Sequence, residues 1–151
     1  MAYIKELKLT YERKRVDDDL LNTPVESASH VYHLFLDMQN DAREKIVCLH
    51  LNPRLEILSY EVIAMGTDHY VISDPIEVFR SAIIVRASKI IVVHNHPLGS
   101  SRPSQTDIEG ANRIRELGEL HRIRLLDFIV IGDDGYFSLD ENGLIGGGTE
   151  A

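Results

Sequence analysis

Two histidines and one aspartate stand close together in the stretch "HNHPLGSSRPSQTD", residues 94 to 107. His94 and His96 are separated by one residue, and Asp107 follows after a short loop rich in Gly, Ser and Pro. Two imidazoles and one carboxylate are three of the four ligands of a catalytic zinc site, in which water takes the fourth position. Zinc lowers the pKa of such a water to about 7. The chemistry that this stretch could support is metal-assisted hydrolysis.

The two histidines follow the run "KIIVV", residues 89 to 93, which is apolar on both faces and predicts a central strand of a sheet. Residues two apart in a strand point to the same side, with Cα atoms roughly 6.6 Å apart. His94 and His96 are therefore expected to project in parallel from the end of this strand. Pro97 stops the strand directly after them. Ends of central strands in α/β sheets are where ligand crevices form.

Asp107 is expected in the first turn of a helix that begins at Ser104 and runs to about Arg122. Positions 107, 111, 114 and 118 share one face of this helix, and the last three are small or apolar. Asp107 is thus predicted at the top of the face that packs on the sheet. A carboxylate placed there is costly unless something pairs with it.

Both halves of this pattern also have a purely structural interpretation. Ser104-x-x-Asp107 is a helix-capping pattern, in which the helix dipole stabilises the aspartate. His94 and His96 could be half-buried, hydrogen-bonded histidines at a strand end. Each half alone favours the structural role, but their coincidence across one short loop favours a metal. The two roles do not conflict, because Ser104 can cap the helix while Asp107 binds a metal ion.

The remainder of the chain predicts an α/β protein with a mixed sheet flanked by helices. Strands are predicted at 45–51, at 55–65, at 89–96 and on both sides of Asp133-Asp134-Gly135, and helices over 25–39, 74–87 and 104–122. Residues 3–11 are expected to form an edge strand or an arm, residues 13–22 a charged loop, and the glycine-rich end of the chain a flexible tail.

The composition of the chain limits the partners that it is expected to bind and the cellular compartment in which it is expected. The chain has 151 residues and a formal net charge of −8, which predicts one domain and disfavours direct nucleic-acid binding. Its one cysteine, Cys48, excludes an internal disulfide and any cysteine-rich zinc site. The sequence shows neither a signal-peptide core nor an apolar run of membrane-spanning length. We therefore expect a soluble, cytoplasmic protein.

Residues 94–107 as a whole resemble the JAMM (MPN+) metalloprotease motif. Their sequence, "HNHPLG…RPSQTD", is most similar to the RadC branch of that superfamily. The segments "IEVFRSAI" (76–83) and "LLDFIVIGDDGYFSL" (125–139) support the resemblance. It implies a cytidine-deaminase-like JAB/MPN domain over residues 25–143, with residues 1–24 as an arm and loop and 144–151 as a tail. It also implies one Zn²⁺ bound by His94, His96 and Asp107, and hydrolysis of a peptide or isopeptide bond in an unidentified peptide or protein.

The same resemblance implies roles for two further residues. JAMM proteins take the general base from a glutamate at the start of the strand after the first helix, which here is Glu44 in "DAREKIVCLHL". Glu61, a carboxylate on a mostly apolar predicted strand, is the alternative base, and either glutamate could instead be a surface salt-bridge residue. Ser104 would help to stabilise the oxyanion.

Two other functions stay open at this stage. Two histidines and a carboxylate also describe ferrous oxygenase sites, which usually lie in all-β barrels rather than in alternating helices and strands. The second alternative is a RadC-type accessory protein of DNA repair with a structural or vestigial metal. Longer RadC proteins carry a helix-hairpin-helix DNA-binding segment before this domain, and we expect none in this chain.

Overall fold

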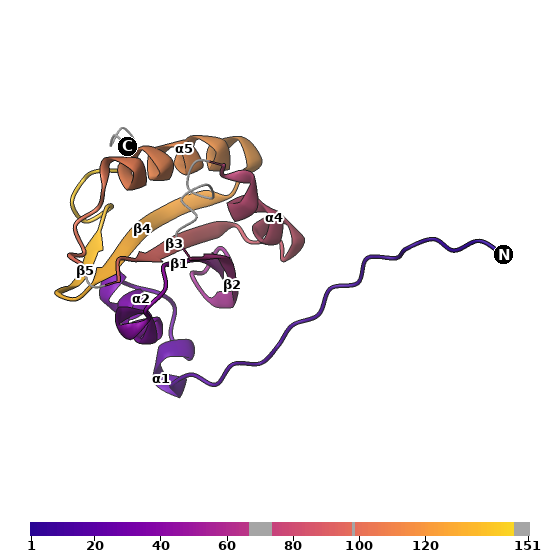
Figure 1. The fold of residues 1–151 in the computed structure, drawn as a ribbon, viewed down its shortest axis with the longest axis horizontal. Helices are drawn as coiled ribbons and strands as arrows, with labels where there is room; N and C mark the ends of the chain where they lie inside the picture. Colours follow the sequence, from indigo (N-terminus) through magenta and orange to yellow (C-terminus); the bar gives the residue numbers. More distant parts are fainter. Residues whose placement is uncertain (67–73, 98, 147–151) are drawn as a thin grey trace.

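The computed structural model describes residues 1–66, 74–97 and 99–146. Those residues contain a five-stranded sheet in the order β2-β1-β3-β4-β5 (Figure 1). The strands are β1 (Lys45–Leu51), β2 (Ile57–Met65), β3 (Lys89–Asn95), β4 (Arg124–Gly132) and β5 (Gly135–Ser138). The pair β3·β4 is parallel and the other pairs are antiparallel. The predicted mixed α/β sheet is confirmed, with the histidine-bearing strand at its centre.

Helices cover both faces of the sheet (Figure 1). On one face, α4 (Ile76–Ile84) and α5 (Gln105–His121) pack on side chains that include Cys48 and Val92. On the other, α2 (Ala28–Leu34) and the 3₁₀ helix η1 (Leu36–Asn40) pack on side chains that include Leu49 and Val93. Successive side chains of a strand point to opposite faces, so β1 and β3 supply both cores. By the same alternation, His94 points to the α5 face.

The N-terminal segments differ in part from expectation. Residues 3–11, all of them described, form an exposed arm that projects from the body, and no strand is assigned to them (Figure 1). Residues 13–22 were expected to be loop, but α1 (Asp18–Leu21) forms there because the Asp17 side chain accepts a hydrogen bond from the Asp19 N–H at the helix start. The end of the predicted tail, residues 147–151, lies outside the described residues.

The helix predicted over 25–39 divides into α2 and η1 at Phe35. Side chains three apart eclipse one another in a 3₁₀ turn. Phe35 and Met38 consequently point the same way, and both are buried against the sheet. None of the described helices is both long enough and apolar enough to span a bilayer.

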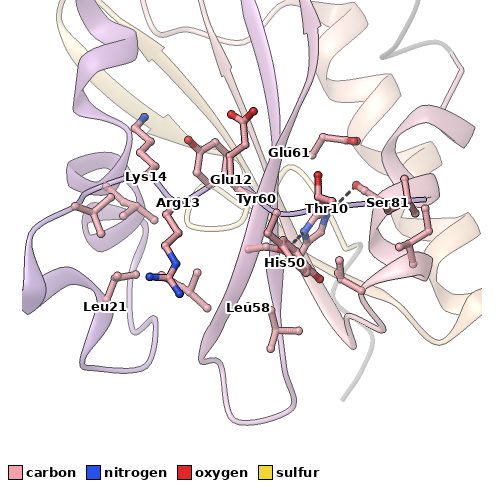
Figure 2. Close-up of a pocket in the computed structure, with 18 of the residues that line it drawn as sticks. Thr10, Glu12, Arg13, Lys14, Leu21, His50, Leu58, Tyr60, Glu61 and Ser81 are labelled. Atoms are coloured by element: carbon pink, nitrogen blue, oxygen red, sulfur yellow. Dashed lines mark hydrogen bonds between the residues drawn. The ribbon is translucent and has the colours of Figure 1, made fainter. Parts of the chain in front are cut away.

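His50 on β1 is buried, as are its apolar neighbours Leu49 and Leu51. Its Nε2 lies 3.0 Å from Ser81 Oγ on α4, and its Nδ1 lies 2.8 Å from Ser59 Oγ on β2. Figure 2 shows His50 with its hydrogen-bond partner Ser81. Burial lowers the pKa of His50 to about 4, so this histidine is neutral at physiological pH.

We expect His50 to make folding less favourable as the pH falls. The pKa of His50 is about 4 in the folded protein and near 6.5 in the unfolded chain, so between these pH values it is neutral when folded and protonated when unfolded. Its contribution to stability is therefore complete above pH 6.5 and is lost as the pH falls towards 4. The shift corresponds to about 3 kcal/mol. Urea unfolding at pH 7 and pH 4 should therefore show a fall in unfolding free energy about 3 kcal/mol larger for the wild type than for His50→Gln.

The difference between the two proteins is the quantity to measure, because other groups titrate in the same range. Burial raises the pKa of Asp127 to about 6, which acts in the opposite direction in both proteins and cancels in the comparison. Equal pH dependence of the wild type and His50→Gln would contradict the assignment of a neutral, buried His50.

Candidate metal centre

The structure brings His94, His96 and Asp107 together, as the sequence predicts. One ligand atom from each of the three residues lies within 4.8 Å of the other two. Asp107 Oδ2 is 3.1 Å from His96 Nε2, and Asp107 Oδ1 is 3.8 Å from His94 Nε2. The side chains of His94 and Asp107 are each 2% exposed, whereas that of His96 is 21% exposed. The cluster is therefore reached from solvent on the His96 side.

The two histidines share a side because the pairing of β3 with β4 continues one residue beyond the strand. The His96 N–H donates to the Ile131 carbonyl at 2.8 Å, although β3 ends at Asn95. His96 thus keeps the alternation that places it beside His94. The two rings are 5.0 Å apart between centroids and stand at 84° to each other.

The second nitrogen of each ring is held by a main-chain carbonyl. His94 Nδ1 lies 3.1 Å from the Lys45 oxygen, and His96 Nδ1 lies 3.0 Å from the Ser100 oxygen. A carbonyl only accepts, so Nδ1 carries the hydrogen in both rings and Nε2 is the nitrogen that can bind a metal. This is the arrangement that fixes the tautomer of histidine ligands in metalloproteins.

The carboxylate tunes the protonation of its neighbours. The hydrogen bond from His96 to Asp107 raises the pKa of His96, whereas burial lowers the pKa of His94. Burial on its own would raise the pKa of Asp107, but the hydrogen bonds from His96 and from the Ser104 N–H outweigh it and lower that pKa. Asp107 is therefore ionised, and its carboxylate can either accept a hydrogen bond from protonated His96 or bind a cation.

Asp107 also caps α5, as the structural interpretation of the Ser104-x-x-Asp107 pattern predicts. The Ser104 Oγ accepts from the Asp107 N–H at 3.0 Å, and Asp107 Oδ2 accepts from the Ser104 N–H at 2.9 Å. This reciprocal capping box fixes the carboxylate at the start of α5. The hydroxyl hydrogen of Ser104 is not used by the cap and can be donated elsewhere.

The two candidate bases lie in different surroundings. Glu44 directly precedes β1. Its charge contributes to the raised pKa of His96 and partly offsets the effect of burial on the pKa of His94, which places its carboxylate near the cluster. Glu61 is exposed on β2 and pairs across the strands with Cys48, which in turn pairs with Val92. Two strand spacings and two residues separate Glu61 from His94, or about 12 Å between Cα atoms.

Glu61 instead lines a groove of about 1120 Å³ between the N-terminal arm, β2 and α4 (Figure 2). Its lining includes Lys14, Tyr60 and His50, and none of the three metal-cluster residues. His50 pairs with Ile90, at the opposite end of β3 from His94. The groove is therefore separate from the metal centre.

The loop that carries Ser100 is held by the turn between β4 and β5. Asp134 accepts from the Ser101 N–H at 2.8 Å and from the Ser100 hydroxyl at 3.4 Å. Gly132 packs against this loop so closely that an added Cβ would overlap the Ser101 nitrogen. The sequence identifies Asp133-Asp134-Gly135 as a turn, but nothing in its spacing links that turn to the orientation of His96.

Sequence comparisons find similar known proteins. The profile of a family described as "RadC-like JAB domain" matches residues 25–144. A UPF0758 protein of Bacillus pumilus is 38% identical over 126 residues, which cover 83% of this chain and 55% of the relative. A UPF0758 protein of Staphylococcus haemolyticus is 41% identical over 120 residues, which cover 79% of this chain and 53% of the relative. The chain thus spans about half the length of the curated relatives it matches.

Proposed function

The chain belongs to the RadC-like JAB domain family, and from that premise we propose that it is a zinc-dependent hydrolase of peptide or isopeptide bonds. The observation that carries the proposal is the convergence of His94, His96 and Asp107, with ligand atoms within 4.8 Å of one another. Two nitrogen donors and one carboxylate are the donor set of catalytic zinc sites that keep one position open.

The side chains fit zinc in two further respects. Both rings present Nε2 because their Nδ1 atoms are bonded to carbonyl groups, and the carboxylate is already ionised. The helices on both faces of the sheet distinguish this fold from the all-β barrels of ferrous oxygenases. A zinc ion held here would supply Lewis acidity and lower the pKa of a bound water to about 7.

Within this function, Glu44 is the general base. Its carboxylate lies close enough to both histidines to influence their pKa values, and it is not one of the three proposed ligands. It accepts the proton of the attacking water and passes it to the departing amine. We favour Glu44 over Glu61 because Glu61 is exposed and lies about 12 Å from His94 between Cα atoms.

Ser104 donates its hydroxyl hydrogen to the oxygen of the carbonyl under attack, where negative charge develops. Its position is fixed by the capping box with Asp107, so the hydroxyl is oriented before the substrate binds. The entrance on the side of His96 gives a peptide or protein substrate access to the centre. The alternative function, an accessory role in DNA repair, finds no support in the formal charge of −8.

The test is metal-dependent hydrolysis. Protein stripped of metal by chelation should take up one zinc per chain, measured by elemental analysis, and only the zinc-loaded form should cleave members of a library of peptides and isopeptide-linked peptides. His33→Ala is a control for the substitution of a histidine outside the metal centre, because His33 is exposed on α2 and its ring bonds to the Ser29 carbonyl. It should keep zinc and activity. Stoichiometric zinc without cleavage, together with DNA binding at physiological salt, would favour the accessory role.

A further inference from the structure

Asn95 lies between the two metal-binding histidines in sequence and points the opposite way. It is 1% exposed. Its Oδ1 accepts a hydrogen bond from the Lys45 N–H at 2.5 Å. Its Nδ2 donates to the carbonyls of Met38 and Arg43, at 3.1 and 3.0 Å. The amide thus makes three hydrogen bonds to the segment that runs from η1 to the first residue of β1.

Two of these bonds fall on either side of Glu44. The peptide groups of Arg43 and Lys45, its immediate neighbours in the chain, are both held by Asn95. The Glu44 carbonyl accepts from the Gly66 N–H at 2.8 Å, and the Lys45 carbonyl meets His94 Nδ1. The main chain on both sides of Glu44 is therefore fixed.

The chemistry of the contact is specific for asparagine. The three bonds require one acceptor and two donors in a fixed plane, which a short carboxamide supplies. An aspartate offers only acceptors, which would face two carbonyl oxygens. The Lys45 N–H, at the first residue of β1, is bonded to a side chain rather than to the main chain of β3. Asn95 therefore completes the strand pairing at the point where β1 begins.

We propose that Asn95 is a positioning residue, which holds Glu44 at the metal centre through the backbone on both sides of it. This inference rests on the proposed function, in which Glu44 is the base. Three consecutive residues at the end of β3 thus have two different roles. His94 and His96 face the metal, while Asn95, on the other face, fixes the segment that brings the base to it.

The experiment compares Asn95→Ala and Asn95→Asp with Asn112→Ala. Asn112 is a matched control, because its Nδ2 also donates to two carbonyls, those of Ile108 and Leu144, on the α5 side of the sheet. Hydrogen–deuterium exchange of the zinc-loaded proteins reports on the segment directly. The Lys45 amide, which loses its acceptor in Asn95→Ala, should exchange at least about tenfold faster in that variant and at the wild-type rate in Asn112→Ala.

Kinetics on a substrate found in the library distinguish positioning from general damage. The Asn95 variants should keep one zinc per chain and lose roughly 10- to 100-fold in kcat, with KM changed less. In a Glu44→Gln background, Asn95→Ala should cause no further loss, because the residue acts only through Glu44. Asn95→Asp keeps an acceptor for the Lys45 N–H and a similar side-chain volume but loses both donors. It provides the kinetic test if Asn95→Ala does not fold.

The outcomes separate the two proposals. Full activity of the Asn95 variants alongside an inactive Glu44→Gln would overturn the positioning role and leave the hydrolase intact. Additive losses in the double variant, or loss of zinc from the Asn95 variants, would also overturn it. Unchanged activity of Glu44→Gln would instead reject the assignment of the base itself.

Discussion

Glu44→Gln is expected to lower kcat by roughly 10²- to 10⁴-fold while one zinc per chain stays bound. Glutamine has nearly the shape of glutamate, but its amide cannot accept the proton of an attacking water. Glu44 is not among the three residues whose ligand atoms converge, so metal content should not change. The main-chain bond between the Glu44 carbonyl and the Gly66 N–H survives the substitution, because it does not involve the side chain.

Steady-state kinetics and elemental analysis of the same preparations test this prediction, with Glu61→Gln as the control. Glu61 lines the separate groove beside the N-terminal arm, so its amide variant should retain activity within about twofold. A reversal of the two results would transfer the role of base to Glu61. Wild-type activity in both variants would mean that neither carboxylate takes the proton.

Asp107→Asn is expected to weaken zinc binding by more than about 100-fold, the upper end of the effect of losing a residue that only supports a ligand. The substitution removes the one anionic donor of the cluster. An asparagine oxygen can still accept from the Ser104 N–H and cap α5. Helix α5 should therefore remain stable, and competition with a chromophoric chelator should show the loss of affinity without unfolding in circular dichroism spectra.

The same variant tests the electrostatics of the centre in zinc-free protein. The hydrogen bond to Asp107 raises the pKa of His96, so this pair stabilises the fold below the unfolded pKa near 6.5, and the contribution is lost as the pH rises through the raised value. In Asp107→Asn the pKa of His96 should fall, as measured by NMR titration of the ring. An unchanged pKa of His96 in the variant would contradict the pairing with Asp107.

For the wild type, zinc affinity should increase with pH across the pKa of His96, since the metal must displace its proton.

The proposed metal ligands were predictable from sequence because they lie within one strand, one loop and one helix turn. The alternation of β3 placed His94 and His96 together, and the capping pattern at Ser104 placed Asp107 in the first turn of α5. Caps and alternation are local features that a single sequence displays. The central position of β3 was also predictable, because the run before His94 is apolar on both faces.

The partners that orient these ligands could not be predicted in the same way. The Lys45 carbonyl and the role of Asn95 depend on the pairing of β1 with β3, and the support from Asp134 depends on how the β4–β5 turn meets the loop. The burial of His50 could not be predicted for a related reason. Alternation assigns one face of a strand to solvent, but β1 is covered by α4 on one face and α2 on the other, so both sets of its side chains are buried.

The pairing of His94 with Lys45 also bears on the order in which the centre assembles during folding. His96 and Asp107 are separated by 11 residues, whereas His94 and Lys45 are separated by 49. Closing the longer loop costs about 1 kcal/mol more chain entropy. Contacts close in sequence tend to form before distant ones, so the three ligands can gather before β1 docks beside β3. We expect a folding chain to be able to capture zinc before Glu44 arrives, so that metal uptake precedes catalytic competence.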